Sequence, residues 1–185
     1  FIDDLLKIRQ KNSRGLKSRF KLLGQIIISL IAIYILYEHS EHQFLNNLYF
    51  PFFKNIIIPM GFFFIPFALF VIVGASNAVN LTDGLDGLAT VPVMLVAISY
   101  TLISYVVGNT IFAEYLKIPY VENAGELSVF CGAIFGSCLG FLWYNAPPAK
   151  IFMGDTGSLS LGGSLAAVAI IVKHEIVLAI IGGLF

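Results

Sequence analysis

The sequence has little charge and no excess of either sign. Only 12% of its 185 residues are charged, with eleven basic against eleven acidic side chains, whereas a soluble domain carries about 25%. A net charge of zero means that the chain as a whole has no basic field of the kind that attracts nucleic acid, so we expect no nucleic-acid partner. Because 58% of the residues are hydrophobic and seventeen are Phe, the composition excludes an ordinary soluble domain and predicts an integral membrane protein.

Cysteine and histidine are scarce as well. Cys131 and Cys138 are seven positions apart in one apolar segment, which on a helix separates them by about 10 Å along the axis. That distance is too long for a disulfide, so we expect two buried thiols. His39 and His42 share a segment with glutamates but with no cysteine, and His174 stands far along the chain. The sequence therefore favours surface histidines over a zinc site.

Long apolar runs are abundant. A helix needs about 20 apolar residues to cross a bilayer, and five runs approach or reach that length, whereas a sixth begins at Ile176 and is cut short. The five runs are 22–37, 56–75, 88–107, 127–144 and 158–172. We therefore predict an all-α, polytopic helical membrane protein with five complete transmembrane helices and a truncated sixth, forming one domain over 1–185. Since the chain starts at Phe1 and stops inside an apolar run, we expect it to be an internal portion of a longer protein.

Five crossings place the connecting segments alternately on two faces. One face holds 1–21, 76–87 and 145–157, and the other holds 38–55, 108–126 and 173–175. Eight of the eleven Lys and Arg residues fall on the first face, which the positive-inside rule assigns to the cytoplasm. All five aspartates fall on that face and all six glutamates on the other. A general preference of acids for water would not separate Asp from Glu, so the separation indicates that three segments bring short carboxylates to one membrane surface.

The first of these segments contains Asp3 and Asp4, followed by a basic run that ends at Lys21. Adjacent carboxylates can bind a metal, or one of them can accept a proton. A solvated helix end with local acid–base pairs is the plainer alternative. The basic residues just before the first span would attract a phosphate-bearing lipid headgroup.

The second segment reads SNAVNLTDGLDGLA over 76–89. Asp83 and Asp86 are three residues apart, so in a helical turn they share a face. We expect Thr82 or Asp83 to cap the third span, whose first N–H groups favour an anion. Glycines beside both aspartates would let a ligand approach the backbone. An ordinary capped turn is the alternative, but the segment is more polar than a turn requires.

The third segment runs from Tyr144 to Ser158, and Pro147 and Pro148 should end the fourth helix. Asp155 then lies between glycines at the start of the fifth span, where a simple helix cap is the alternative role. Phe152 offers an aromatic face for stacking on a base or packing on lipid. Carboxylates without nearby His or Cys favour a hard cation, and Mg²⁺ typically binds one or two carboxylates together with substrate phosphates.

These segments resemble a known family. Asp3-Asp4 with the run 15–21, NAVNLTDGLDGLA over 77–89 and FMGDTGSLSLGG over 152–163 are similar to the polyprenyl-phosphate N-acetylhexosamine-1-phosphate transferases, and the resemblance covers essentially the whole chain. The motif sequences are most similar to those of the branch that makes lipid I and UMP from UDP-MurNAc-pentapeptide and undecaprenyl phosphate. This reaction is the first membrane step of peptidoglycan synthesis. The resemblance implies ten membrane helices in the full-length protein, a homodimer, Mg²⁺, and a bacterial inner-membrane location with the active site facing the cytoplasm.

The resemblance also implies roles for individual residues. Asp155 matches the Mg²⁺ ligand, and Asp3 matches the proposed base, with Asp4 beside it. Phe152 matches the aromatic that stacks on uracil, and Lys21 matches a basic residue near the lipid phosphate. The implied catalytic set is Asp3, Asp4, Asp83, Asp86 and Asp155, and the implied substrate-binding set is Lys21, Asn77, Asn80, Leu81, Asn145 and Phe152. Asp83, Asp86, Leu81 and Asn145 match positions of the nucleoside pocket. A His-rich motif that the family carries toward its C-terminus is absent from this chain.

Two alternatives stay open at this point. A related transferase that uses UDP-GlcNAc or another UDP-aminosugar would share the same motifs. A cation transporter would also carry membrane carboxylates, but it would need them near the midplane, whereas every aspartate here falls in a loop or at the end of a span. A purely structural scaffold gives no reason for three Asp-containing loops on one face.

Overall fold

The computed structural model describes residues 5, 9, 17–39, 46–53 and 56–185 of the chain. Within them, five helices are long and apolar enough to cross a membrane, which confirms the predicted fold class and the number of spans. The candidate spans are Ser18–His39, Gly61–Thr82, Thr90–Val107, Ala124–Asn145 and Gly154–Ile171. Cys131 and Cys138 are both free and buried, as expected.

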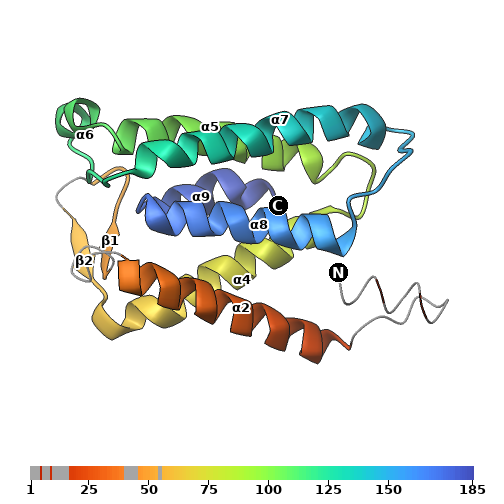
Figure 1. Ribbon diagram of the computed structural model, residues 1–185, viewed down its shortest axis with the longest axis horizontal. Helices are drawn as coiled ribbons and strands as arrows, with labels where there is room; N and C mark the ends of the chain where they lie inside the picture. The colour runs from red at the N-terminus through yellow and green to blue at the C-terminus, as the bar shows by residue number, and fades with distance from the viewer. Residues whose placement is uncertain (1–4, 6–8, 10–16, 40–45, 54–55) are drawn as a thin grey trace.

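The elements follow one another as a set of helices interrupted by one small hairpin (Figure 1). In chain order they are α2 (Ser18–His39), β1 (Asn47–Tyr49), β2 (Ile57–Pro59), η1 (Gly61–Phe63), α4 (Phe64–Thr82), α5 (Thr90–Val107), α6 (Thr110–Leu116), η2 (Ala124–Glu126), α7 (Leu127–Asn145), α8 (Gly154–Ile171), α9 (Glu175–Ile181) and η3 (Gly182–Leu184).

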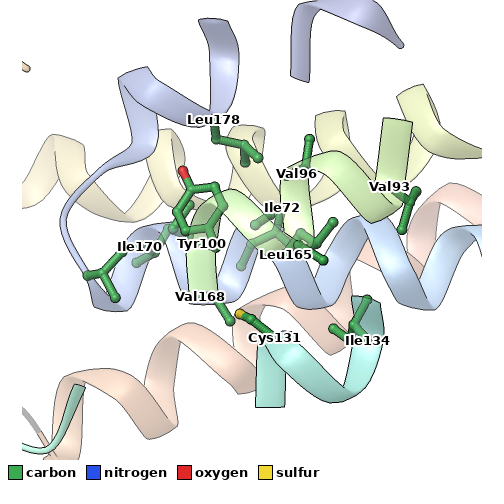
Figure 2. Packing of buried hydrophobic residues seen from close by; sticks show 14 of the residues in the cluster. Ile72, Val93, Val96, Tyr100, Cys131, Ile134, Leu165, Val168, Ile170 and Leu178 are labelled. Atoms are coloured by element: carbon green, nitrogen blue, oxygen red, sulfur yellow. The ribbon is translucent and has the colours of Figure 1, made fainter. Parts of the chain in front are cut away.

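Two helix pairs form the centre of the bundle. α5 packs along α7 and α4 packs along α8, whereas α2 packs chiefly against α4 at the edge of the molecule (Figure 1). Buried side chains from both pairs meet between them (Figure 2), among them Val96 and Tyr100 of α5, Cys131 of α7 and Leu165 of α8. The first residues of α8 are thereby fixed close to the end of α4.

A glycine brings α4 and α8 into backbone contact. A Cβ at Gly162 would lie 2.5 Å from the carbonyl oxygen of Ala75 and 2.8 Å from the Cα of Ser76, so a side chain does not fit there. The Ser76 hydroxyl donates to the carbonyl of Leu159 at 2.8 Å across the same contact. Small interfacial residues and hydroxyl bonds of this kind hold membrane helices together, because lipid supplies no hydrophobic drive between helices.

The second span differs from the prediction at both ends. Residues 57–59 form β2, which pairs antiparallel with β1 so that Leu48 faces Ile58, instead of starting a helix. α4 then continues to Thr82, so that Asn77 and Asn80 lie on a helix and not in the predicted loop. Their polar side chains are satisfied by neighbouring helices, which allows the helix to continue through them.

The expected helix caps are also wrong. Asp83 is the C-cap of α4, and α5 begins at Thr90 after Ala89 without a side-chain cap. Asp155 lies in the first turn of α8, which starts at Gly154, four residues earlier than the fifth predicted run.

The turn between α8 and α9 contains the predicted external segment 173–175, but it buries two opposite charges. The Lys173 ammonium donates to the Glu175 carboxylate at 3.1 Å, and neither side chain is exposed. The same ammonium lies 4.6 Å from the centre of the Phe64 ring. Burial lowers the pKa of Lys173 and raises that of Glu175, and each partner opposes the shift of the other.

Candidate active site

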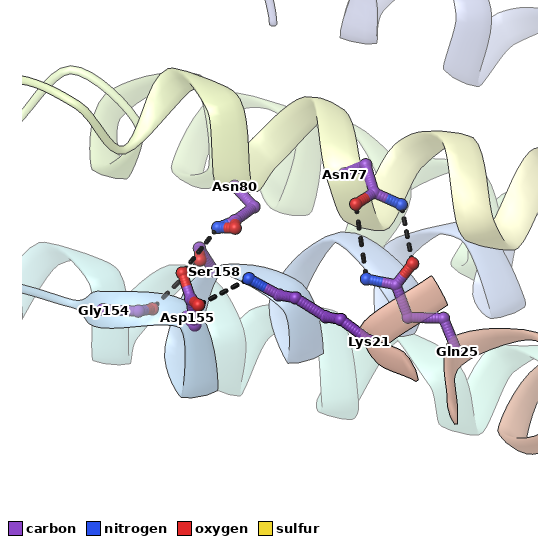
Figure 3. Close-up of polar contacts among 7 residues, drawn as sticks. All are labelled: Lys21, Gln25, Asn77, Asn80, Gly154, Asp155 and Ser158. Atoms are coloured by element: carbon purple, nitrogen blue, oxygen red, sulfur yellow. Dashed lines mark hydrogen bonds and ion pairs between the residues drawn. The ribbon is translucent and has the colours of Figure 1, made fainter. Parts of the chain in front are cut away.

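Asp155 is the centre of a polar cluster formed by three helices (Figure 3). Its Oδ2 accepts from the Lys21 Nζ of α2 at 2.5 Å, and its Oδ1 accepts from the Asn80 Nδ2 of α4 at 2.9 Å. The two contacts join residues that are 134 and 75 positions apart in the chain. The structure therefore brings together three of the residues singled out in the sequence.

Asp83 lies next to this cluster at the end of α4. Partial burial raises the pKa of its carboxyl above the ordinary value; a hydrogen bond from the Gly154 backbone opposes that shift, and the negative charge of Asp155 adds to it. Gly154 has a positive φ of 65°, a conformation that glycine adopts without a Cβ penalty. The bend at Gly154 thus lets α8 start close to Asp83.

Asp86 holds the α7–α8 loop. Its Oδ2 accepts from the backbone N–H of Ala149 at 2.9 Å. Asn145, which is buried, accepts from the Thr90 hydroxyl at 2.6 Å and donates to the Ile151 carbonyl at 2.9 Å. These contacts connect the start of α5, the end of α7 and the loop that leads to Asp155.

Two predicted substrate residues project outward. Phe152 is 69% exposed and Leu81 is 83% exposed, so the side chains of both are available to a ligand. Asp3 and Asp4 lie outside the described residues.

A groove leads from Asp155 along the membrane-spanning helices. It has a volume of about 460 Å³ and is lined by α2, α4 and α8. On α8 its lining extends from Asp155 to Ala167, which is about 18 Å of helix. Most of its surface is apolar, although Gln25 and several Ser and Thr side chains line it together with Asp155.

The carboxylates at this site fit a hard cation that also binds substrate. Among the residues that the structure describes, no group of three or more His, Cys, Asp or Glu side chains is arranged to hold a metal. Asp155 with Asp83 beside it offers oxygen donors only. That set is too small for an all-protein cage, but it suits Mg²⁺, which commonly completes its coordination with phosphate oxygens and water.

Residues 1–173 match the model of glycosyl transferase family 4. The chain belongs to this family. The match confirms the resemblance seen in the motifs, and it covers every residue of the cluster around Asp155.

Two curated relatives of this family 4 chain carry the same name. The chain is 68% identical over 183 residues to a phospho-N-acetylmuramoyl-pentapeptide-transferase of Pelagibacter ubique (strain HTCC1062), covering 99% of the chain and 51% of that protein. It is 59% identical to the protein of the same name from Rickettsia prowazekii (strain Madrid E), covering 100% and 51%. The chain thus spans about half the length of the curated relatives it matches.

One contact of this family 4 chain was missed at the sequence level. Gln25 of α2 and Asn77 of α4 form two amide hydrogen bonds, of 2.8 and 3.3 Å (Figure 3). A polar amide within an apolar span is itself a signal, because such side chains usually find a partner on another helix. Gln25 follows Lys21 by four residues, so both lie on one face of α2.

Proposed function

We propose that the full-length protein transfers phospho-MurNAc-pentapeptide from UDP-MurNAc-pentapeptide to undecaprenyl phosphate, forming lipid I and releasing UMP. A bond forms between an oxygen of the lipid phosphate and the β-phosphorus of the nucleotide. The bond from that phosphorus to the bridging oxygen breaks, and UMP leaves. The observation that carries the proposal is the contact of Asp155 with both Lys21 and Asn80, in a chain whose relatives bear the name of this transferase.

The chemistry requires positioning and charge neutralisation more than a strong nucleophile. Lys21 offers an ammonium at the mouth of the apolar groove, where a lipid phosphate can be held while its chain follows α8. Asp155 would hold Mg²⁺, with Asp83 nearby; the bound ion would neutralise diphosphate charge. Asn80 fixes the orientation of the Asp155 carboxylate.

The nucleoside would lie beside the α7–α8 loop. Phe152 is exposed for stacking on uracil, and Leu81, which is also exposed, would line the proposed pocket. Asp86 and Asn145 support this pocket through their contacts with the loop. Asp3, with Asp4 beside it, is the proposed base. We further propose that the protein is a homodimer of the bacterial inner membrane with this site facing the cytoplasm.

The test uses the full-length protein with undecaprenyl phosphate and radiolabelled UDP-MurNAc-pentapeptide. We expect lipid-linked product that disappears on chelation and returns with Mg²⁺. Asp155→Asn should lower turnover by about 10³-fold, since it removes the charge that binds the metal, without a loss of folded protein.

Glu122→Gln is the matched control, because it makes the same change of acid to amide on an exposed residue of the opposite end. It should keep full turnover. Near-normal turnover of Asp155→Asn would contradict the metal role, and UMP release from UDP-GlcNAc alone would replace the proposed substrate.

A further inference from the structure

The Gln25–Asn77 pair is a reciprocal contact inside the membrane-spanning region. The Asn77 Nδ2 donates to Gln25 Oε1 at 2.8 Å, and the Gln25 Nε2 donates to Asn77 Oδ1 at 3.3 Å. Asn77 Nδ2 also donates to the Val73 carbonyl at 2.8 Å. Each amide therefore both donates and accepts, and Asn77 is held to its own helix as well.

The pair lies one helical turn from the contacts of Asp155. Gln25 follows Lys21 by four residues on α2, and Asn77 precedes Asn80 by three on α4, so each helix presents both of its residues on one face. Figure 3 shows the Gln25–Asn77 pair beside the contacts of Asp155. If α2 slid along α4 by one turn, about 5.4 Å, the amides would separate and Lys21 would leave Asp155.

Within the described part of the chain, few side chains of α2 are fully buried. Only Ser29 and Ile33 are buried on this helix, and among the described residues its main packing partner is α4. Apolar side chains on a lipid-facing helix can slide past one another at little cost, because lipid solvates them equally well. A reciprocal amide pair is satisfied in one register only, and in other systems a single buried amide fixes the register of paired helices.

We propose that Gln25 is a positioning residue, whose amide pair with Asn77 fixes the register of α2 against α4 and thereby places Lys21 at Asp155. This inference rests on the proposed function for its effect on catalysis. Gln25 lines the groove in which the lipid chain is proposed to lie, but it is one turn away from the contacts of Asp155, so it acts on the reacting groups through Asn77 and through the placement of its own helix.

The first readout is kinetic and uses the full-length enzyme. Gln25→Leu should lower kcat by about 10- to 100-fold, because a misplacement of about 1 Å can cost that much, whereas KM for UDP-MurNAc-pentapeptide should change less than about twofold. Tyr37→Phe is the matched control on the same helix. It removes a hydroxyl that bonds with Asn46 at the far end of α2, and it should leave kcat unchanged.

The second readout needs no substrate. Spin labels at Leu23→Cys on α2 and Trp143→Cys on α7, both exposed positions, report the α2 position as a distance distribution in full-length protein whose other cysteines are replaced. The distribution should broaden in Gln25→Leu and stay narrow in Tyr37→Phe. The exchange Gln25→Asn with Asn77→Gln keeps two amides and their combined length, so it should restore the narrow distribution.

If the full-length enzyme is active, the proposal requires that Gln25→Leu both lowers kcat and broadens the distance distribution. An unchanged distance distribution in Gln25→Leu, a broadened one with unchanged kcat, or failure of the exchange to restore the narrow distribution would overturn it. If the unmodified protein forms no lipid-linked product, the proposed function fails, and the distance distributions alone decide whether the amide pair sets the register.

Discussion

Asp86 and Asp155 are both short carboxylates at the same end of the bundle, but they have different contacts. Asp155 accepts from the side chains of Lys21 and Asn80, whereas Asp86 accepts from the backbone of Ala149. The first carboxylate is surrounded by groups that can exchange for a ligand. The second secures a loop, so a substitution at each should have a different consequence.

We expect Asp86→Ala to loosen the α7–α8 loop. Without the carboxylate, the Ala149 N–H loses its acceptor, a change of about 1 kcal/mol or somewhat more. Amide exchange at Ala149, measured by mass spectrometry on the full-length protein, should accelerate by roughly tenfold. Asp86→Asn keeps an acceptor oxygen and should remain close to the unmodified rate. Equal exchange in both variants would show that the carboxylate does not hold the loop.

At the residue scale, the sequence indicated candidate site residues, but it did not predict their contacts. The sorting of aspartates onto one face singled out Asp83, Asp86 and Asp155 before any geometry was available. It could not show that Lys21 reaches Asp155, because 134 residues separate them. Gln25 carries a signal of its own, a polar amide within an apolar span, but the sequence does not show that its partner is Asn77, 52 residues away on another helix.

Among the helices, α4 contributes most to the site. It packs along α8, contacts α2 and carries both Asn77 and Asn80 near its end. The sequence predicted that this stretch was a loop, because its Asn, Thr and Gly residues are typical of turns. The prediction failed since the polar groups are satisfied by Gln25, Asp155 and Leu159 on neighbouring helices, which no local pattern reveals. The three-residue strands of the hairpin are likewise too short to give a periodic signal.

The contact of α4 with α8 should tolerate no side chain at Gly162. Gly162→Ala would force the new methyl against the Ala75 backbone and should cost about 1–3 kcal/mol. We expect a lower thermal unfolding midpoint for the purified full-length protein in detergent.

Gly163→Ala is the neighbouring control. A Cβ there would approach no atom closer than the Ser76 Oγ at 4.0 Å, so the midpoint should stay near that of the unmodified protein. Similar midpoints for the two variants would contradict the close approach of α4 and α8.

In the whole molecule, the two ends of the bundle are chemically distinct. The end with Asp155 also holds Lys21, Asp83 and Asp86, whereas the opposite end holds the hairpin, α6 and the buried Lys173–Glu175 pair. Five alternating crossings predict a division of this kind, because they leave little freedom in connectivity. The burial of Lys173 and Glu175 was not predictable, since their three-residue segment has the polarity of an exposed turn.

The sidedness can be tested with two exposed lysines. Lys150 lies in the α7–α8 loop and Lys117 follows α6 at the other end. In intact cells that produce the full-length protein, a membrane-impermeant maleimide should label Lys117→Cys, and should label Lys150→Cys only after permeabilisation. The reverse pattern would invert the proposed orientation, and labelling of both in intact cells would contradict the placement of the two loops on opposite sides.

The ion pair between Lys21 and Asp155 limits which charged ligands can bind at this site. Each is partly exposed, 27% and 21% respectively, and each neutralises the other. A ligand that brings only a negative charge would pair with the ammonium and leave the carboxylate without its ion-pair partner. A cation alone would leave the ammonium without its partner. A phosphate that binds together with its own counter-ion meets no such penalty. The ammonium then pairs with the phosphate while the carboxylate pairs with the counter-ion. The site around Asp155 is thus suited to a ligand whose phosphate and counter-ion bind together.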